Sequence, residues 1–187
     1  MGFSELFRPR AVAVFGSVSQ GKLGGILIDQ LLGGGFPRVY AVNPKAQSPE
    51  GVPAYTSVFD APDDVDLAVI ATPAATVPGI LEDCGKRGIR AAVVISSGFS
   101  EAGNAAGEAE LVDIARRYGI RFIGPNCAGL SNAHHALQAT IQAHAPKGGT
   151  AIVSQSGAVG GAILELANAH GLGVSKFVSY GNGADLN

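Results

Sequence analysis

Residues 11–25 read AVAVFGSVSQGKLGG, an apolar run followed by a glycine-rich loop and the start of a periodic stretch. An unbroken apolar run is typical of a parallel strand that is buried on both faces. Leu23, Ile26, Leu27 and Leu31 are spaced as on one face of a helix, which Gly33-Gly34-Gly35 then ends. This stretch therefore predicts a strand, a tight turn and a helix, the opening unit of a nucleotide-type α/β domain.

The same alternation continues along the chain. Apolar runs predict strands at 39–42, 67–71, 92–95 and 121–123, and periodic stretches predict helices at 75–86 and 107–118. Five strands with intervening helices indicate α/β architecture, here a Rossmann-like doubly wound parallel sheet over residues 1–130.

A second unit follows. Residues 131–148 are polar and rich in small side chains, so we expect a connection with little regular structure. A strand at 150–153, a helix at 157–169 and a strand at 174–178 then predict the start of a second α/β domain, residues 149–187. Because one β-α-β unit cannot bury both faces of its strands, we expect that domain to be truncated and the chain to be a segment of a larger protein.

Composition restricts the partners. The 187 residues carry a formal net charge of −2, which argues against a nucleic-acid partner held by a basic face. No apolar run reaches the roughly 18 residues that span a bilayer, and the N-terminus does not resemble a secretory signal. Two cysteines, Cys84 and Cys127, without a CxxC pair, fit a reducing cytoplasm. We expect a cytoplasmic protein without nucleic-acid or membrane partners.

The loop after the first strand is the first candidate site. Its glycines allow close backbone approach, and the following helix directs free N–H groups at an anion, so we interpret it as a phosphate cradle. The alternative is a glycine-rich turn that serves only tight packing. Residues 16–22 fit G-x-x-x-x-G-K, but Leu23 stands where an NTPase needs Ser or Thr for Mg²⁺, and G-x-G-x-x-G is absent. The candidate cradle residues are Gly16, Ser17, Gln20, Gly21 and Lys22.

The second strand ends in Asn43-Pro44-Lys45. An NAD site would usually carry Asp or Glu there, for the ribose hydroxyl groups. A lysine suits a ribose phosphate instead, and both NADP and coenzyme A carry one.

The remaining loops give weaker signals. Cys127 follows the fifth strand, and a buried packing role is favoured over that of a nucleophile. Ser154 or Ser156 can cap the helix that begins at Gly157, as an ordinary N-cap or as part of a phosphate site, and both interpretations stay open. A nucleophile elbow needs a glycine at position 154. The four histidines show no metal-ligand spacing, so no metal site is expected.

Four segments together resemble a known family. They are IGPNCAG (123–129), IVSQSG (152–157), VNPK (42–45) and ISSGFSEAG (95–103). In this order the chain resembles the NDP-forming acyl-CoA synthetases, namely ADP-forming acetyl-CoA synthetase and the α subunit of succinyl-CoA synthetase. The resemblance implies a CoA-binding domain followed by the opening part of a flavodoxin-like ligase domain.

The resemblance also implies roles for particular residues. Ser17, Gln20, Gly21 and Lys22 would surround the phosphates of coenzyme A, and Lys45 would contact its nucleotide portion. Residues that would line the adenine and pantetheine path are Thr72, Pro73, Ala74, Ser96 and Ser97. Succinyl-CoA synthetase has Glu where Ser97 stands, which weakens succinate as a substrate.

The helix predicted at 157–169 would take part in the family's chemistry. The start of that helix, with Ser154, Ser156 and Gly157, resembles the one that steadies a phosphohistidine. That histidine lies further along in the family, so no catalytic residue is expected in this segment.

The activity that the resemblance implies belongs to a larger assembly. It is the reaction of acyl-CoA, ADP and phosphate to carboxylic acid, CoA and ATP, through an acyl phosphate and a phosphohistidine. ATP or ADP and Mg²⁺ would bind an ATP-grasp subunit or domain that this sequence lacks, and we expect an oligomer. By itself the segment is expected to bind CoA without completing catalysis.

Other functions remain open on the sequence. One is a CoA-ester-binding regulatory domain of a protein acyltransferase. A second is an NADP-binding oxidoreductase or redox-sensing domain, and a third is an interaction domain with an empty cleft.

Overall fold

The computed structural model describes residues 3–19 and 21–187. Its first sheet has six parallel strands in the order β3-β2-β1-β4-β5-β6. The chain leaves β1 toward β2 and β3, and β4 toward β5 and β6, so the topological switch point lies between β1 and β4. The strands are β1 (Ala11–Gly16), β2 (Val39–Val42), β3 (Ala54–Tyr55), β4 (Val65–Ala71), β5 (Ala91–Val94) and β6 (Arg121–Ile123).

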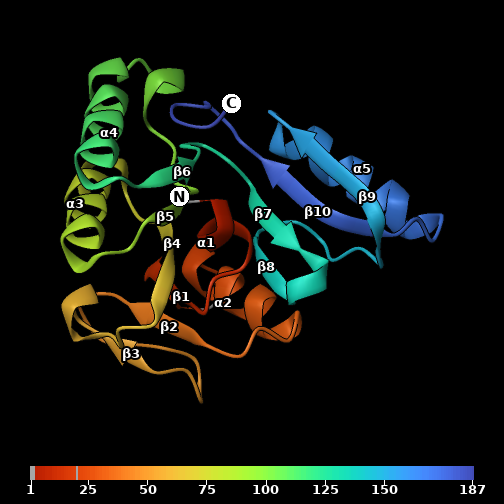
Figure 1. Cartoon of the computed structure of the whole chain (residues 1–187), viewed down its shortest axis with the longest axis horizontal. Helices are drawn as coiled ribbons and strands as arrows, with labels where there is room; N and C mark the ends of the chain where they lie inside the picture. The colour runs from red at the N-terminus through yellow and green to blue at the C-terminus, as the bar shows by residue number, and fades with distance from the viewer. Residues whose placement is uncertain (1–2, 20) are drawn as a thin grey trace.

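Helices cover both faces of this sheet. Figure 1 shows α3 (Val77–Arg87) and α4 (Ala105–Tyr118) on one side and α1 (Phe3–Phe7) with α2 (Leu23–Gly33) on the other. Every residue of β1 is buried, and its side chains alternate between two hydrophobic clusters. Phe15 packs in the cluster of α3 and α4, whereas Val14 packs in the cluster of α2. The doubly wound sheet predicted from the sequence is confirmed.

The two-residue strand β3 was not predicted. The chain passes from β2 to β3 and on to β4 without an α-helix, through loops and the 3-10 turn η1 (Val58–Asp60). The face of the sheet beside α3 is therefore bordered at this edge by the loop that follows β3.

A second, four-stranded sheet has the order β8-β7-β10-β9. Its strands are β7 (Gly129–Asn132), β8 (Leu137–Thr140), β9 (Lys147–Ser154) and β10 (Val174–Ser179), with α5 (Gly157–Ala169) between the last two. The predicted strand-helix-strand unit is present, and β9 and β10 are parallel. We call the part from β7 onward the second lobe.

The expectation of little regular structure in residues 131–148 is wrong. β7 and β8 form an antiparallel hairpin, and β7 also pairs with β10. The polar side chains that suggested a loop are buried and bonded instead: the Thr140 hydroxyl donates to the Ala128 carbonyl at 2.6 Å, and Asn132 donates to the Phe7 carbonyl at 2.8 Å. Hydrogen bonds to distant segments thus let polar residues occupy a buried sheet.

None of the helices within the described ranges combines the length and the apolar character that crossing a bilayer requires.

Candidate functional site

A cavity of about 530 Å³ opens at the switch point between β1 and β4. Loops from the carboxyl ends of β1, β2 and β4 form one part of its wall, and α3 with the loop after β3 forms the rest. Its lining residues are Phe15, Gly16, Ser17, Val18, Ser19, Val42, Asn43, Pro44, Lys45, Gln47, Thr56, Ser57, Val58, Thr72, Pro73, Thr76, Ile80 and Asp83. We call it the switch-point cavity.

The junction of β1 and α2 requires glycine for packing. Gly16 has φ +146°, and a Cβ there would lie 2.6 Å from the Ala71 carbonyl oxygen of β4. A Cβ at Gly24 would lie 2.6 Å from the Ser17 carbonyl oxygen. These two glycines are explained by close backbone approach, so their presence does not by itself indicate a phosphate.

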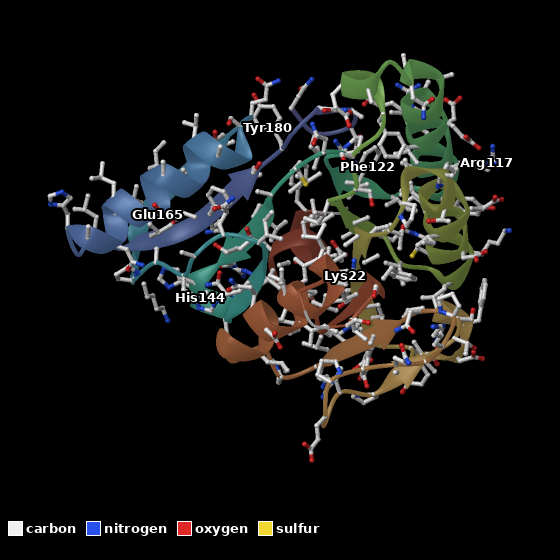
Figure 2. The ribbon with its side chains drawn as sticks, turned by 180° about the vertical axis from the view of Figure 1, so that it is seen from behind. Lys22, Arg117, Phe122, His144, Glu165 and Tyr180 are labelled. Carbon is white, nitrogen blue, oxygen red and sulfur yellow. The ribbon has the colours of Figure 1, made fainter. Side chains whose placement is uncertain are left out.

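The start of α2 leaves its first backbone N–H groups without a side-chain cap. No side chain caps the helix, because its N-cap residue is Lys22, which makes no capping hydrogen bond. Uncapped N–H groups at a helix start, together with the helix dipole, favour a negative charge. Gly21 and Lys22 are exposed beside the cavity but do not line it, and Gln20 lies outside the described residues. Lys22 is labelled at the start of α2 in Figure 2.

Asn43 shapes the turn that presents Lys45. Its side-chain oxygen accepts from the backbone N–H groups of Lys45 at 3.3 Å and Gln47 at 3.1 Å, and its amide donates to the Gln47 carbonyl at 2.7 Å. Asn43 is 9% exposed, whereas Lys45 is exposed and lines the cavity. The buried amide therefore holds the loop while the lysine ammonium group remains free to meet a ligand.

The end of β4 contributes Thr72 and Pro73 to the cavity wall. The Thr72 hydroxyl oxygen is buried and has no hydrogen-bond partner among the described residues. Its backbone N–H donates to the Ser96 hydroxyl at 3.1 Å. Ser96 is buried and supports this strand end from behind, and Ser97 and Ala74 do not line the cavity. A buried hydroxyl without a partner is rare in proteins, so this strand end is a candidate site.

Several lining residues were not predicted from the sequence, among them two after β3 and three on α3 or its N-cap. Thr56 and Ser57 follow β3, which is too short to give a periodic signal. Thr76, Ile80 and Asp83 stand at spacings of four and three residues and so share one face of α3. That spacing was available in the sequence, but which face of the helix meets the cavity depends on the packing of α3.

A second cavity, of about 670 Å³, lies where the two lobes meet. Ser156, Gly157 and Ala158 at the start of α5 line it, with Asn126 and Cys127 from the loop after β6. The Ser156 hydroxyl accepts from the Val159 N–H at 3.2 Å, so it is an N-cap. The Ser154 hydroxyl instead donates to the Ser156 carbonyl at 2.9 Å, and Ser154 does not line the cavity.

Two ionisable groups of this second cavity have shifted pKa values. Burial raises the pKa of the Cys127 thiol to about 12, and the thiol donates to the Val94 carbonyl at 3.3 Å. At neutral pH Cys127 is therefore protonated, which supports a packing role over a nucleophilic one. Partial burial alone would raise the pKa of Glu101, but hydrogen bonds from Asn182 and from the backbone N–H of Gly98 outweigh it and lower the pKa.

Comparison with known proteins gives two family matches. The family described as "CoA binding domain" matches residues 10–133, and the family described as "Succinyl-CoA ligase like flavodoxin domain" matches residues 147–187. The first match covers most of the chain and contains the whole switch-point cavity.

Curated relatives are ligases of greater length. The chain is 47% identical over 180 residues to the ADP-forming acetate–CoA ligase of Methanocaldococcus jannaschii, covering 95% of this chain and 25% of that protein. It is 43% identical over 183 residues to the α subunit of ADP-forming acetate–CoA ligase II of Pyrococcus furiosus, covering 96% of this chain and 40% of that subunit. The chain therefore spans between a quarter and two-fifths of these relatives.

Solved structures share the fold. An acetyl-coenzyme A synthetase 1 of Ca. Korarchaeum cryptofilum superposes with a TM-score of 0.94 at 43% identity, covering 98% of this chain and 41% of that one. The same protein has also been solved in complex with phosphate and ADP.

Proposed function

This chain belongs to the NDP-forming acyl-CoA synthetases, and from that membership we propose that it is the coenzyme A-binding portion of such a ligase. The observation that carries the proposal is the switch-point cavity, which the exposed Lys45 and the unpartnered Thr72 line and beside which α2 begins without a side-chain cap. Coenzyme A combines anionic phosphates, a ribose phosphate and a purine, and the residues present fit each of these groups.

We assign the phosphates to the loop after β1 and the start of α2. Ser17 lines the cavity, and Gly16 allows the backbone to approach β4. Gly21 and Lys22 stand next to the cavity, and the proposed cradle includes Gln20 as well. Backbone N–H groups and one ammonium group are suited to a diphosphate because they neutralise charge without a metal ion.

Lys45 is assigned to the 3′-phosphate of the ribose. Asn43 holds its loop, and the exposed ammonium group lies on the cavity wall. The Thr72 hydroxyl, with Pro73 beside it, is assigned to the ligand's middle portion.

The pantetheine arm would then pass Ala74, Ser96 and Ser97 toward the second cavity. There the start of α5, with Ser156 and Gly157 on the cavity wall and Ser154 next to them, would steady the phosphohistidine. Ser96 acts in this assignment by supporting Thr72 and not by contact with the ligand, because it is buried behind the strand end.

The ligase activity is proposed for the whole protein. Acyl-CoA, ADP and phosphate would be converted to a carboxylic acid, CoA and ATP, with the phosphohistidine and the ATP-grasp part supplied from outside these 187 residues. Residues 1–130 would form the CoA-binding domain and 149–187 the start of the ligase domain, and the connection between them, 131–148, would carry most of the β7–β8 hairpin. We also propose that a further subunit or domain completes the enzyme. The proposed location is the cytoplasm, where the cysteine thiols would stay reduced.

Isothermal titration of the 187-residue chain with coenzyme A, NADPH and NADH tests the binding function. We expect saturable binding of coenzyme A at one site and no comparable binding of either nicotinamide cofactor. Tight binding of NADPH without binding of coenzyme A would contradict the proposal and favour an oxidoreductase or redox-sensing domain.

A further inference from the structure

The switch-point cavity has two chemically different ends. Among its described lining residues Lys45 is the basic one and Asp83 the acidic one. The lysine and the loop after β1 belong to the edge of the sheet where the strands end. A carboxylate in a cavity that receives phosphates must lie away from them, because like charges at short distance destabilise each other.

The geometry of α3 separates the two ends. The helix begins just after the carboxyl end of β4 and runs back along the sheet, and Thr76, Ile80 and Asp83 line the cavity from one face of it. Asp83 is seven residues beyond Thr76, which corresponds to about 10 Å along a helix axis. The cavity thus extends from the phosphate edge to a carboxylate about two helical turns deeper.

Asp83 has no cation to neutralise it among the described residues. The two basic residues that follow it on α3 are bonded elsewhere: Lys86 pairs with Glu82 at 3.4 Å, and Arg87 pairs with Asp63 and donates to the Ala61 carbonyl at 2.7 Å. Asp83 takes part in none of the six ion pairs found within residues 3–19 and 21–187. An ionised carboxylate only accepts hydrogen bonds, so this half-buried group is matched by a ligand that donates one.

Apolar walls of the cavity suit a flat ring. Phe15, Val42, Val58 and Ile80 line the cavity with apolar side chains. Adenine combines apolar faces with a single exocyclic amino group that donates hydrogen bonds. We propose that Asp83 selects adenine by accepting a hydrogen bond from its 6-amino group, an inference that rests on the proposed binding of coenzyme A.

Two ligands and three variants test this role. The ligands are coenzyme A and its analogue whose purine lacks the 6-amino group, each titrated calorimetrically into the 187-residue chain. A hydrogen bond to a charged acceptor predicts a preference of about tenfold for coenzyme A in the wild-type chain. Asp83→Ala should bind both ligands equally, and Asp83→Asn, whose amide oxygen still accepts, should keep part of the preference. Asp113→Asn on α4 is the charge-matched control, because Asp113 is exposed and lies outside the cavity, and it should behave as wild type.

The outcomes separate the two proposals. Equal binding of both ligands by the wild-type chain would overturn the role of Asp83 and leave coenzyme A binding intact, as would a preference that survives in Asp83→Ala. Failure of the wild-type chain to bind coenzyme A at all would overturn the proposed function and this inference with it. The comparison of ligands on the wild-type chain needs no substitution, so it decides the question even if a variant does not fold.

Discussion

Asn43 is buried and Lys45 is exposed, although only Pro44 separates them. The difference arises because the amide of Asn43 replaces backbone partners inside the turn, bonding the N–H groups of Lys45 and Gln47. A side chain that satisfies its own loop frees the neighbouring lysine for a ligand. At the scale of single residues, we therefore propose that Asn43 holds the loop and that Lys45 binds the ligand.

Lys45→Ala should weaken binding of coenzyme A more than binding of dephospho-coenzyme A. The lost charge-assisted contact contributes about 1–2 kcal/mol, or roughly 5- to 30-fold in affinity. Titration calorimetry with both ligands measures the difference, with Lys147→Ala in the second lobe as a matched exposed-lysine control. Equal losses for the two ligands would mean that Lys45 does not contact the 3′-phosphate.

At the scale of elements, the junction of β1 and β4 depends on Gly16. Gly16→Ala combines a strained positive φ with a Cβ placed 2.6 Å from the Ala71 carbonyl oxygen, so we expect destabilisation of about 2–3 kcal/mol. Urea unfolding followed by circular dichroism measures it. Gly79→Ala in α3, where an added Cβ meets nothing within 4 Å, should instead stabilise the chain by roughly 0.5–1 kcal/mol. A Gly16→Ala variant as stable as the wild type would contradict the packing described here.

An ion pair joins β1 and β4 at their amino-terminal ends, away from Gly16. Arg10 donates to Asp66 through its side chain, at 2.8 and 2.9 Å, and through its backbone N–H at 2.8 Å. These hydrogen bonds lower the pKa of Asp66 below its ordinary range. Because the folded-state pKa is lowered, the stabilisation is complete above the unfolded pKa and is lost as the pH falls through the folded value.

Asp66→Asn should therefore reduce stability at neutral pH and lose less of it on acidification than the wild type. The measurement is the free energy of unfolding in urea between pH 7 and pH 3, with the exposed Asp113→Asn as control. Parallel curves for the wild type and Asp66→Asn would show that the pair does not contribute to the acid sensitivity.

At the scale of the whole molecule, the last residues return to the first sheet. Asp185 accepts from the Arg121 side chain and from the backbone N–H of Phe122 on β6, each at 2.9 Å. The Ala184 N–H donates to the Gly124 carbonyl at 3.1 Å. These bonds, together with the contact between Asn132 and Phe7, attach the second lobe beside the loops that carry Asn126 and Cys127.

Asp185→Ala should destabilise the chain by roughly 1–2 kcal/mol, because it leaves the N–H of the buried Phe122 without its acceptor. A thermal melt should show a midpoint lower by about 2–4 °C per kcal/mol for a chain of this size. Asp185→Asn keeps an acceptor oxygen and should lose less. Identical melting of Asp185→Ala and the wild type would contradict the attachment described here.

Local pattern was sufficient for most of the architecture. Buried strands appear as uninterrupted apolar runs, and helices as apolar residues at intervals of three and four, so the first sheet and the final strand-helix-strand unit were predicted close to their observed bounds. Gly16, Ser17 and Lys45 were candidates from the loop sequences, and Thr72 and Pro73 were candidates from the family resemblance. All five line the switch-point cavity.

What only the tertiary structure decided depends on contacts between distant segments. The β7–β8 hairpin is polar in sequence and becomes a strand pair because β10, some 45 residues beyond β7, supplies its partner. In the sequence Asp83 is an ordinary helix residue, and only the packing of α3 places it on the cavity wall. Ser96 was predicted to line the ligand path, but in the structure it accepts a hydrogen bond from Thr72 and does not line the cavity. Periodicity along the chain determines which side chains share a face, whereas the free energy of packing between elements determines what that face meets.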